Sequence, residues 1–304
     1  MSDAVFRSGY VTLVGMPNAG KSSLINALLR EKVAAVSDRP QTTRNAVRCI
    51  LTTGEYQIIL VDTPGIHRPR HALGEFMMKE ASGAVDAVDA VCFVVDVTRE
   101  PDHVWGEPLD SIAGCRSPII LVPNKIDLVR NMEVFWKRVA LLQEMTRSTS
   151  VIPVSAVKGT NLDVLRSEMA RFLPEGERIY PEDVVMDTTE RFLAEEIIRE
   201  KIIRLTEDEV PHSVAVVVEE FKNPEEYPEM TSIEIRAVII VERPGQKGIL
   251  IGDKGAMIKA IRGAARIEMK KRFGYPVSLE LWVKVKPGWR KSRIGIERAG
   301  YRRG

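Results

Sequence analysis

The stretch GMPNAGKS, Gly15 to Ser22, constrains the fold of this chain more than any other feature of the sequence. It follows the strand-length apolar run YVTLVG and opens a helical pattern. Two glycines, a lysine and a serine in this register form a P-loop, in which backbone N–H groups and the lysine surround phosphate oxygens. Such a match arises by chance in a chain of this length with odds on the order of one per cent. The loop therefore predicts an α/β nucleotide-binding domain.

Strand-length apolar runs alternate with helical patterns through the first half of the chain. Several of them are uninterrupted by polar residues, which is typical of parallel strands covered on both faces. This pattern predicts a doubly wound, mostly parallel sheet over residues 1–173. The runs are YVTLVG, YQIILVD, AVCFVVD, PIILVPN and VIPV.

The second half of the chain has a different organisation. Residues 174–189 are rich in proline and charge and are predicted to be a linker, with a hinge between Pro174 and Pro181. Residues 190–304 then give a helix, the strands HSVAVVVEEF and SIEIRAVIIVE, the stretch GILIGDKGAMIKAI, a long helix and the strand VSLELWVKV. The order α-β-β-α-α-β predicts a second, compact α+β domain.

Charge is unevenly distributed along the chain. Residues 243–304 contain seventeen basic and four acidic residues, a net charge of +13, whereas the whole chain carries only +2 and residues 1–242 therefore carry −11. A strongly basic end indicates a polyanionic partner. Three cysteines, the lack of a signal-peptide pattern and the lack of any apolar run near ~18 residues predict a reduced, cytoplasmic protein, with membrane-surface association left open.

Downstream motifs indicate which base is bound. NKID follows the run IILVP, and Asp127 is placed there to accept from both the ring N–H and the exocyclic amine of guanine, which adenine cannot offer. Lys125 would lie along the base and Asn124 would tie this loop to the P-loop. In SAVKG, which starts at Ser155, the N–H of Ala156 could meet the guanine O6. An isolated NKID would be a solvated turn, but about a hundred residues after a P-loop it predicts GTP as the substrate.

A magnesium site is predicted between these motifs. The hydroxyl of Ser22 would ligate Mg²⁺, and Asp62 in DTPGI would hold it through water. The Gly65 N–H would sense the γ-phosphate. A threonine of QTTR should cover the metal; Thr43 is favoured and Thr42 stays open. Lys21, Thr43 and Gly65 are the predicted catalytic residues, and the predicted GTP-binding residues of the P-loop are Gly15, Asn18, Ala19, Gly20, Lys21, Ser22 and Ser23.

A second glycine loop, GDKG, lies between the apolar ILI and a helical pattern, which is the helix, GxxG, helix arrangement of a KH domain. The nearby GQKG, from Gly245, is predicted to be a loop before a helix. After GDKG, basic residues recur on one helical face; a solvated face is the ordinary interpretation, but their unmixed sign favours RNA. The strand IEIRAVIIV would present its edge to about four bases. The predicted RNA-binding residues are Gly252, Asp253, Lys254, Gly255, Lys259, Arg262 and Arg266.

Taken together, these motifs make the chain resemble the Era family, which are ribosome-associated, translation-factor-like GTPases with a C-terminal type II KH domain. The resemblance covers nearly all 304 residues. It is carried by MPNAGKSSLINAL, QTTRN, DTPGIH, NKID, ERPGQKGILIGDKGAMIK and LELWVKVKPGW. It implies a Mg²⁺-dependent GTPase switch that binds the 3′ end of small-subunit (16S) ribosomal RNA and acts, as a monomer, in assembly of the small ribosomal subunit.

The resemblance also bears on catalysis and on the basic end. Ile66 stands where many small GTPases place a glutamine, which implies slow hydrolysis by the domain alone. Asn18 implies a K⁺ ion beside the phosphates, as in related families. Trp282 lies in a strand and is predicted to be core, whereas Trp289 could be exposed. The basic residues after Trp289 could extend RNA contact or bind the inner membrane surface; a GTPase with a protein or anionic-lipid partner is the alternative function.

Overall fold

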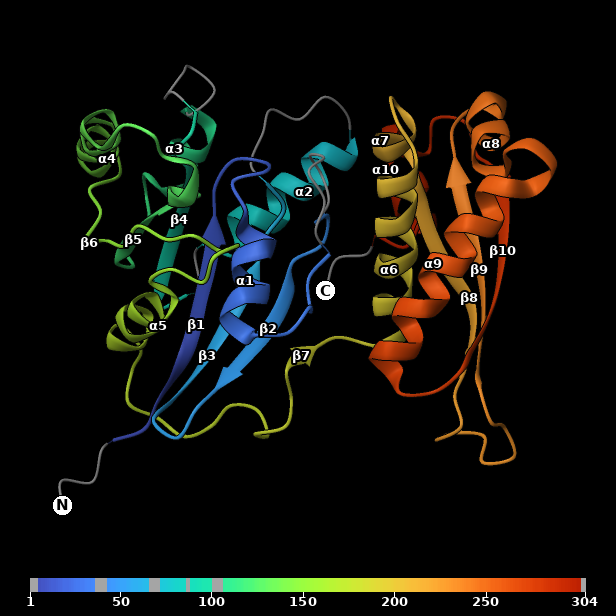
Figure 1. Ribbon diagram of the computed structural model, residues 1–304, viewed down its shortest axis with the longest axis horizontal. Helices are drawn as coiled ribbons and strands as arrows, with labels where there is room; N and C mark the ends of the chain where they lie inside the picture. The colour runs from blue at the N-terminus through green and yellow to red at the C-terminus, as the bar shows by residue number, and fades with distance from the viewer. Residues whose placement is uncertain (1–4, 36–42, 66–71, 86–87, 100–105, 302–304) are drawn as a thin grey trace. The chain divides into compact units, whose positions relative to one another are not determined.

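The computed structural model describes residues 5–35, 43–65, 72–85, 88–99 and 106–301. The chain divides into two compact units, and the division along the sequence falls between Asp187 and Thr188. Both units are drawn in Figure 1. Among the residues described, none of the helices is both long and apolar enough to cross a lipid bilayer.

The first unit is built on a seven-stranded sheet in the order β6-β5-β4-β1-β3-β2-β7. Strands β1, β3, β4, β5 and β6 run parallel; β2 pairs antiparallel with β3, and β7 pairs antiparallel with β2 at the edge. The sequence predicted the five parallel strands but identified neither β2 nor β7. The strands are β1 Arg7–Val14, β2 Val47–Thr52, β3 Tyr56–Asp62, β4 Ala90–Asp96, β5 Ile119–Asn124, β6 Ser150–Val151 and β7 Met186–Asp187.

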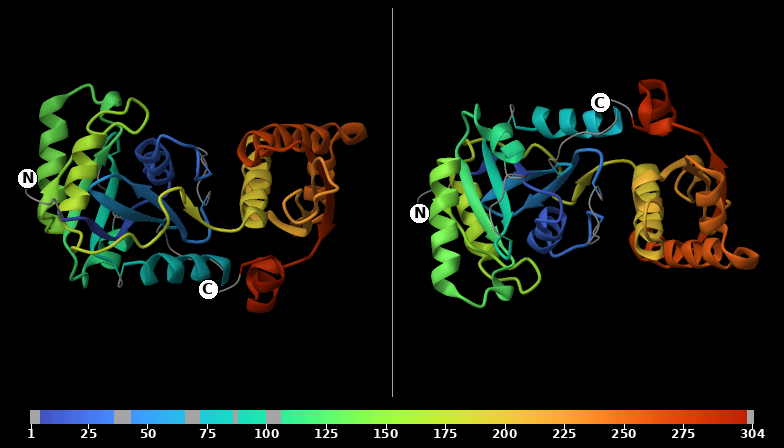
Figure 2. Two further views of the ribbon diagram at one scale, coloured as in Figure 1. Left: turned by 90° about the horizontal axis from the view of Figure 1, so that it is seen from below. Right: turned by 90° about the horizontal axis from the view of Figure 1, so that it is seen from above.

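Helices cover both faces of this sheet, which is why β4 is buried along its whole length. In β4, Cys92 and Val94 pack in a core that includes α1 and α5, whereas Val91, Phe93 and Val95 pack in a second core with α3 and α4. Figure 2 shows α1 and α2 on opposite faces. The predicted doubly wound α/β class is confirmed. The helices are α1 Lys21–Leu29, α2 Ala72–Gly83, α3 Gly106–Ile112, α4 Met132–Thr146 and α5 Leu162–Arg171, with a 3₁₀ turn η2 Ile126–Leu128.

The segment predicted to be a linker packs on the first unit for most of its length. The backbone N–H of Ser8 donates to the carbonyl of Pro174 (3.1 Å). The buried side chain of Gln57 donates to the carbonyl of Tyr180 (2.9 Å) and accepts the N–H groups of Ile179 (2.8 Å) and Tyr180 (2.9 Å). Strand β7 then pairs with β2. The predicted hinge between Pro174 and Pro181 is therefore held in place, because a buried glutamine satisfies its main chain.

The second unit has the predicted element order α-β-β-α-α-β, with two further short helices, α7 after the first helix and α10 after the last strand. Its sheet order is β10-β9-β8, with β9 parallel to β10 and antiparallel to β8. Helices α6 and α9 pack against each other and contribute, with the sheet, to one apolar core. The elements are α6 Glu190–Leu205, α7 Val210–Ser213, β8 Ala215–Lys222, β9 Ile233–Val241, α8 Pro244–Ile251, η3 Asp253–Gly255, α9 Ala256–Phe273, β10 Val277–Val285, η4 Trp289–Lys291 and α10 Arg293–Arg298.

Three local predictions in this unit were wrong. GQKG is the first turn of α8 rather than a loop, because Gln246 accepts the N–H of Arg243 (3.0 Å) and caps the helix. Trp282 is 45% exposed, since the alternation of β10 points its neighbour Val283 into the core instead. Trp289 is buried, donating its indole N–H to the carbonyl of Ser213 (3.0 Å) and stacking on the ring of Tyr301.

Candidate active site and nucleic-acid interface

The P-loop connects the end of β1 to the start of α1, and its glycines are required by close contacts. A Cβ on Gly15 would lie 2.1 Å from the carbonyl oxygen of Val94. A Cβ on Gly20 would lie 2.3 Å from the side-chain nitrogen of Asn124, and Gly20 has a φ of +95°. Helix α1 begins at Lys21 without a side-chain cap at Gly20, so the first N–H groups of the helix face the loop. This is the geometry of a helix N-terminal anion site.

Lys21 is buried at the base of this loop. Its ammonium donates to the carbonyls of Gly15 (2.9 Å) and Met16 (3.0 Å). Burial lowers the pKa of Lys21 to about 8, although the carboxylate of Asp62 acts in the opposite direction. Phosphate oxygens would favour the charged ammonium, so the residue is suited to bind a polyphosphate.

Three side-chain oxygens from different parts of the sequence meet beside the P-loop. Asp62 Oδ2 accepts hydrogen bonds from Ser22 Oγ (2.9 Å) and Thr43 Oγ1 (3.1 Å), and the two hydroxyls lie 3.1 Å apart. Hydroxyl and carboxylate oxygens are the ligands that Mg²⁺ prefers, so this set fits the metal. The structure thus brings Thr43 to the predicted site, whereas Thr42 lies outside the described residues. Ser23 follows on the first turn of α1 and is half-buried.

Gly65 lies in backbone contact with the P-loop. A Cβ at this position would lie 2.8 Å from the Cα of Pro17, so a larger residue would push the loop after β3 away from the P-loop. The end of β3 is also fixed by Thr63, whose hydroxyl donates to the carbonyl of Leu13 (2.7 Å). The N–H of Gly65 is therefore held near the predicted phosphate site. Ile66 lies outside the described residues.

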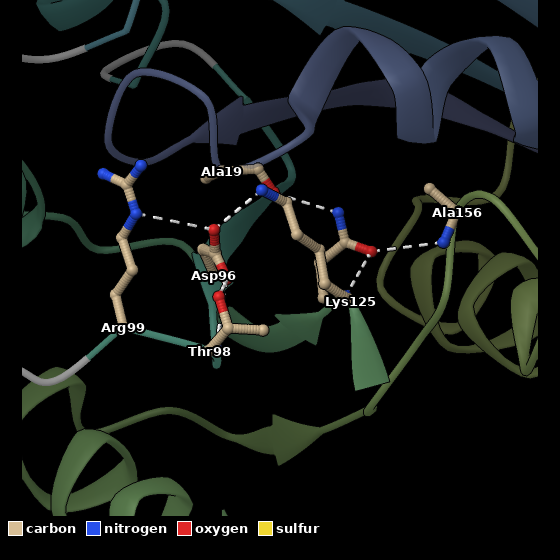
Figure 3. Close-up of polar contacts among 7 residues, drawn as sticks. Ala19, Asp96, Thr98, Arg99, Lys125 and Ala156 are labelled. Carbon is tan, nitrogen blue, oxygen red and sulfur yellow. Dashed lines mark hydrogen bonds and ion pairs between the residues drawn. The ribbon is translucent and has the colours of Figure 1, made fainter. Parts of the chain in front are cut away.

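Asn124, at the end of β5, joins three loops. Its amide nitrogen donates to the carbonyl of Ala19 in the P-loop (2.9 Å), and its oxygen accepts the N–H groups of Lys125 (2.8 Å) and Ala156 (3.1 Å). Figure 3 shows these contacts around Ala19, Lys125 and Ala156. The structure therefore brings the NKID and SAVKG motifs and the P-loop together at one edge of the sheet.

Asp127 belongs to the same cluster. It lies in η2, directly after Lys125, and its Oδ1 accepts a hydrogen bond from Ser155 Oγ (2.5 Å). Ser155 also receives the N–H of Lys158 at its hydroxyl (3.1 Å), which holds the turn. The SAVKG motif, which also contains Ala156, therefore fixes the orientation of the Asp127 carboxylate. A site that recognises the edge of one base needs its hydrogen-bonding groups held in fixed orientations.

Sequence reasoning missed Asp96 in this site. It lies at the end of β4, and its Cα is paired in register with that of Asn124 on β5. Its Oδ2 accepts a hydrogen bond from the ammonium of Lys125 (2.7 Å). The signal was present in the sequence, since the apolar run AVCFVVD ends in an acidic residue at the carboxyl end of a parallel strand, where ligands bind in such sheets.

The GDKG loop of the second unit has an unusual backbone. Gly252, Lys254 and Gly255 have φ values of +71°, +46° and +79°. A Cβ on Gly252 would lie 2.7 Å from the backbone nitrogen of Met257, so the loop turns tightly against the start of α9. Lys254 and Asp253 are exposed at its tip. The loop can therefore bring backbone close to a phosphate, with one cation beside it.

Helix α9 separates its apolar and basic faces as predicted. Ile261, Ala265 and Met269 are buried in the core of the second unit. Glu268, the acidic residue within this helix, pairs with Lys201 of α6. Arg266 also donates from Nε to the carbonyl of Val277 (2.8 Å), which fixes its side chain. The exposed basic face consists of Lys259, Arg262, Arg266 and Lys270.

The prediction that the strand IEIRAVIIV presents a free edge to the bases is wrong. Strand β9, which contains IEIRAVIIV, is the central strand of its sheet and is paired on both sides. The edge strand that packs against α8 and α9 is β10. Sequence gives the strands but not their order, so it could not distinguish the two.

Among the basic residues near the C-terminal end of the chain, Arg290 forms an ion pair with Glu242 and donates a hydrogen bond to the carbonyl of His212 (2.9 Å), both within the second unit.

Comparisons with known proteins cover both units. The family model described as a 50S ribosome-binding GTPase matches residues 10–125, and the KH domain model matches residues 209–290. GTPase Era of Geobacter metallireducens is 42% identical over 99% of this chain and 100% of its own length. GTPase Era of Carboxydothermus hydrogenoformans is 43% identical over 97% of this chain and 98% of its own. The chain belongs to the Era GTPase family.

Solved Era structures agree with the fold of the whole chain. Era in complex with MgGDPNP and nucleotides 1506–1542 of 16S ribosomal RNA has a TM-score of 0.92 and 38% identity, covering 97% of this chain and 99% of that one. A tyrosine-to-alanine variant of Aquifex aeolicus Era bound to GDP and AlF4⁻ has a TM-score of 0.89, also at 38% identity and the same coverage. As an Era protein the chain is a GTPase with a C-terminal KH domain, which confirms the predicted fold and enzyme class.

Proposed function

We propose that this chain is a GTP-dependent switch that binds the 3′ end of 16S ribosomal RNA through its second unit during small-subunit assembly. The observation that carries the proposal is the GDKG loop, which is followed by an exposed helical face of one charge sign, in a GTPase of the Era family. The Era relative crystallised with MgGDPNP and 16S ribosomal RNA supports it. Both proposed sites lie within one chain, so we take the acting species to be a monomer.

The roles of the nucleotide-site residues follow from the contacts described above. The N–H groups from Asn18 to Ser22 would bind the β-phosphate, and the Lys21 ammonium would bridge the β- and γ-phosphates. Ser22 and Thr43 would hold Mg²⁺ directly and Asp62 through water. The metal, when bound, neutralises charge that develops on the phosphate oxygens. Gly65 would donate its N–H to the γ-phosphate, so this residue and Thr43 would lose a contact when the phosphate leaves.

The RNA would lie in the groove between the GDKG loop, helices α8 and α9, and the edge strand β10. The loop backbone and Lys254 would contact phosphates, while Lys259, Arg262 and Arg266 would continue this contact along α9. About four unpaired nucleotides fit such a groove. Exposed Ile249 and Ile251 of α8 offer an apolar surface for the bases.

The test is the binding of a short single-stranded RNA that matches the 16S 3′ end, measured by fluorescence anisotropy with GDP or a non-hydrolysable GTP analogue. We expect affinities that differ by at least about fivefold between the two nucleotides. The logarithm of the affinity should fall linearly with the logarithm of the salt concentration, with a slope of about −3, as four phosphate contacts predict. Equal affinities in both nucleotide states would contradict the switch.

An anionic membrane surface is the alternative partner, favoured by the net charge of +13 over residues 243–304. The same experiment separates the two proposals when vesicles with anionic lipid compete with the RNA. If vesicles bind as tightly as RNA and displace it without regard to nucleotide, the lipid surface is the better assignment. If only RNA responds to the nucleotide, the RNA assignment stands.

We also propose that Asn18 helps to bind K⁺ beside the phosphates. Its backbone is left-handed, with a φ of +64°, at the outer turn of the P-loop. We expect GTP turnover to be at least about tenfold faster in K⁺ than in Na⁺ at matched ionic strength, because a bound cation would stabilise transition-state charge. Asn18→Ala should remove this difference while turnover in Na⁺ changes little. Equal rates in both salts for the unaltered chain would exclude the proposal.

A further inference from the structure

Asp96 is a buried carboxylate, and its contacts with described residues lie beside the proposed base pocket. It is only 8% exposed and lies at the carboxyl end of β4, next to Asn124 of β5. Figure 3 shows Asp96 between Thr98 and Arg99 of its own loop and Lys125 of the NKID motif. The roles assigned above to phosphate, metal and base do not by themselves require a carboxylate at this point.

The two oxygens of Asp96 have different partners. Oδ1 accepts the hydroxyl of Thr98 (2.6 Å) and the Thr98 N–H (3.0 Å), so the turn after β4 fixes the plane of the carboxylate. Oδ2 accepts the ammonium of Lys125 (2.7 Å), and the Arg99 Nε lies 3.7 Å from it. Burial acts to raise the pKa of Asp96, but the hydrogen bonds from Lys125 and Thr98 and the charge of Lys125 outweigh it and lower the pKa. The group therefore stays ionised at neutral pH.

The Lys125 side chain requires a fixed acceptor for its ammonium if its methylene chain is to lie against a base. Its backbone is left-handed, with a φ of +67°, so the side chain leaves the loop from a constrained position. A lysine has four rotatable bonds and loses most of that freedom when its methylene chain must lie flat against a base. A fixed acceptor for the ammonium removes that freedom before the nucleotide arrives, which favours binding.

We propose that Asp96 is a positioning residue for guanine nucleotides, which fixes the ammonium of Lys125 so that the lysine methylene chain forms a preorganised wall of the base pocket. Thr98 completes the arrangement by orienting the Asp96 carboxylate. The inference rests on the proposed function, specifically on Lys125 lining the base pocket, and goes beyond it by assigning a role to a residue outside the NKID and SAVKG motifs.

The test is a double-mutant cycle on GDP affinity, measured with a fluorescent GDP analogue on the full chain. The four proteins are the unaltered chain, Asp96→Asn, Lys125→Met and the double variant. We expect Asp96→Asn to weaken GDP binding about tenfold, and to have less than about a twofold effect when Lys125 is already methionine. A carboxylate that only stabilised the fold would give the same loss in both backgrounds.

Two further variants keep the test decisive if Asp96→Asn is poorly folded. Thr98→Val leaves the carboxylate in place but removes a hydroxyl that orients it, and should weaken GDP binding about threefold only while Lys125 is present. Arg99→Ala is the matched control, because its side chain is 63% exposed and its contact with Asp96 is longer; it should change affinity by less than about twofold.

The outcomes also distinguish this inference from the proposed base pocket. If Lys125→Met weakens GDP binding but the Asp96 and Thr98 variants do not, the pocket stands and the positioning role is excluded. If Lys125→Met leaves GDP affinity unchanged, both the pocket assignment and the positioning role fail.

Discussion

Asp127→Asn is expected to change the base preference of this GTPase from GTP to xanthosine triphosphate. The Asp127 carboxylate would accept two N–H groups of guanine, whereas an asparagine offers one acceptor and one donor and so leaves the exocyclic amine facing another donor. Xanthine carries a carbonyl where guanine has that amine, so it matches the asparagine. Mismatched buried polar groups are costly, and we expect GTP affinity to fall by about a hundredfold or more.

Competition of GTP and xanthosine triphosphate for a fluorescent nucleotide measures this change. The Ser155 hydroxyl contacts Asp127 Oδ1 at 2.5 Å and can still donate to an asparagine oxygen, so the turn should survive. Asp183→Asn, at an exposed carboxylate in the same unit, makes the same chemical change outside the site and should leave the preference for GTP intact. Retained guanine selectivity in Asp127→Asn would refute the assignment of base reading to this residue.

Lys254→Asp is expected to abolish RNA binding while GTP affinity is retained. Reversing the charge at the tip of GDKG replaces attraction for a phosphate with repulsion at the point where backbone and RNA should lie closest. Lys254 has a left-handed backbone, which aspartate tolerates better than most residues, so the loop should keep its shape. We expect at least a hundredfold loss of affinity for the 16S 3′-end RNA, roughly the size of two charge-assisted contacts.

The matched control is Lys291→Asp, which makes the same change in net charge at an exposed position of the same unit. It should weaken RNA binding by no more than about threefold, since it alters only the general attraction between the basic unit and a polyanion. If both variants lose RNA equally, the interaction is unspecific charge attraction rather than recognition by the loop. If neither loses RNA, the interface lies elsewhere.

The location of the proposed nucleotide site could be predicted from the sequence because its residues directly follow strands of one parallel sheet. Carboxyl ends of neighbouring parallel strands meet at one edge, so motifs after β1, β3 and β5 had to converge. In the structure Ser22 contacts Asp62, and Asn124 contacts the P-loop at Ala19, as this topology requires. Thr43 required more, because the loop that carries it precedes β2, a strand that the sequence did not reveal.

What the sequence could not predict depends on contacts across the chain. Trp282 and Trp289 were assigned to the wrong environments because composition favours a buried strand tryptophan, whereas the phase of β10 and a carbonyl acceptor on Ser213 decide the outcome. The central place of β9 depends on strand order, which pairing across the sheet determines. The Asp96 and Lys125 pair joins two strand ends whose register appears only in the folded sheet.

Gln57 fixes part of the segment that connects the two units to the first unit. Its side chain bonds main-chain groups of Ile179 and Tyr180, more than a hundred residues later in the chain, so these amides belong to the same cooperative unit as β3. The covalent connection that can bend is then not the sixteen-residue segment that the sequence indicated, but only the few bonds from Asp187 to the start of α6 at Glu190. A connection this short contains few backbone dihedral angles, whereas a free sixteen-residue linker would supply many.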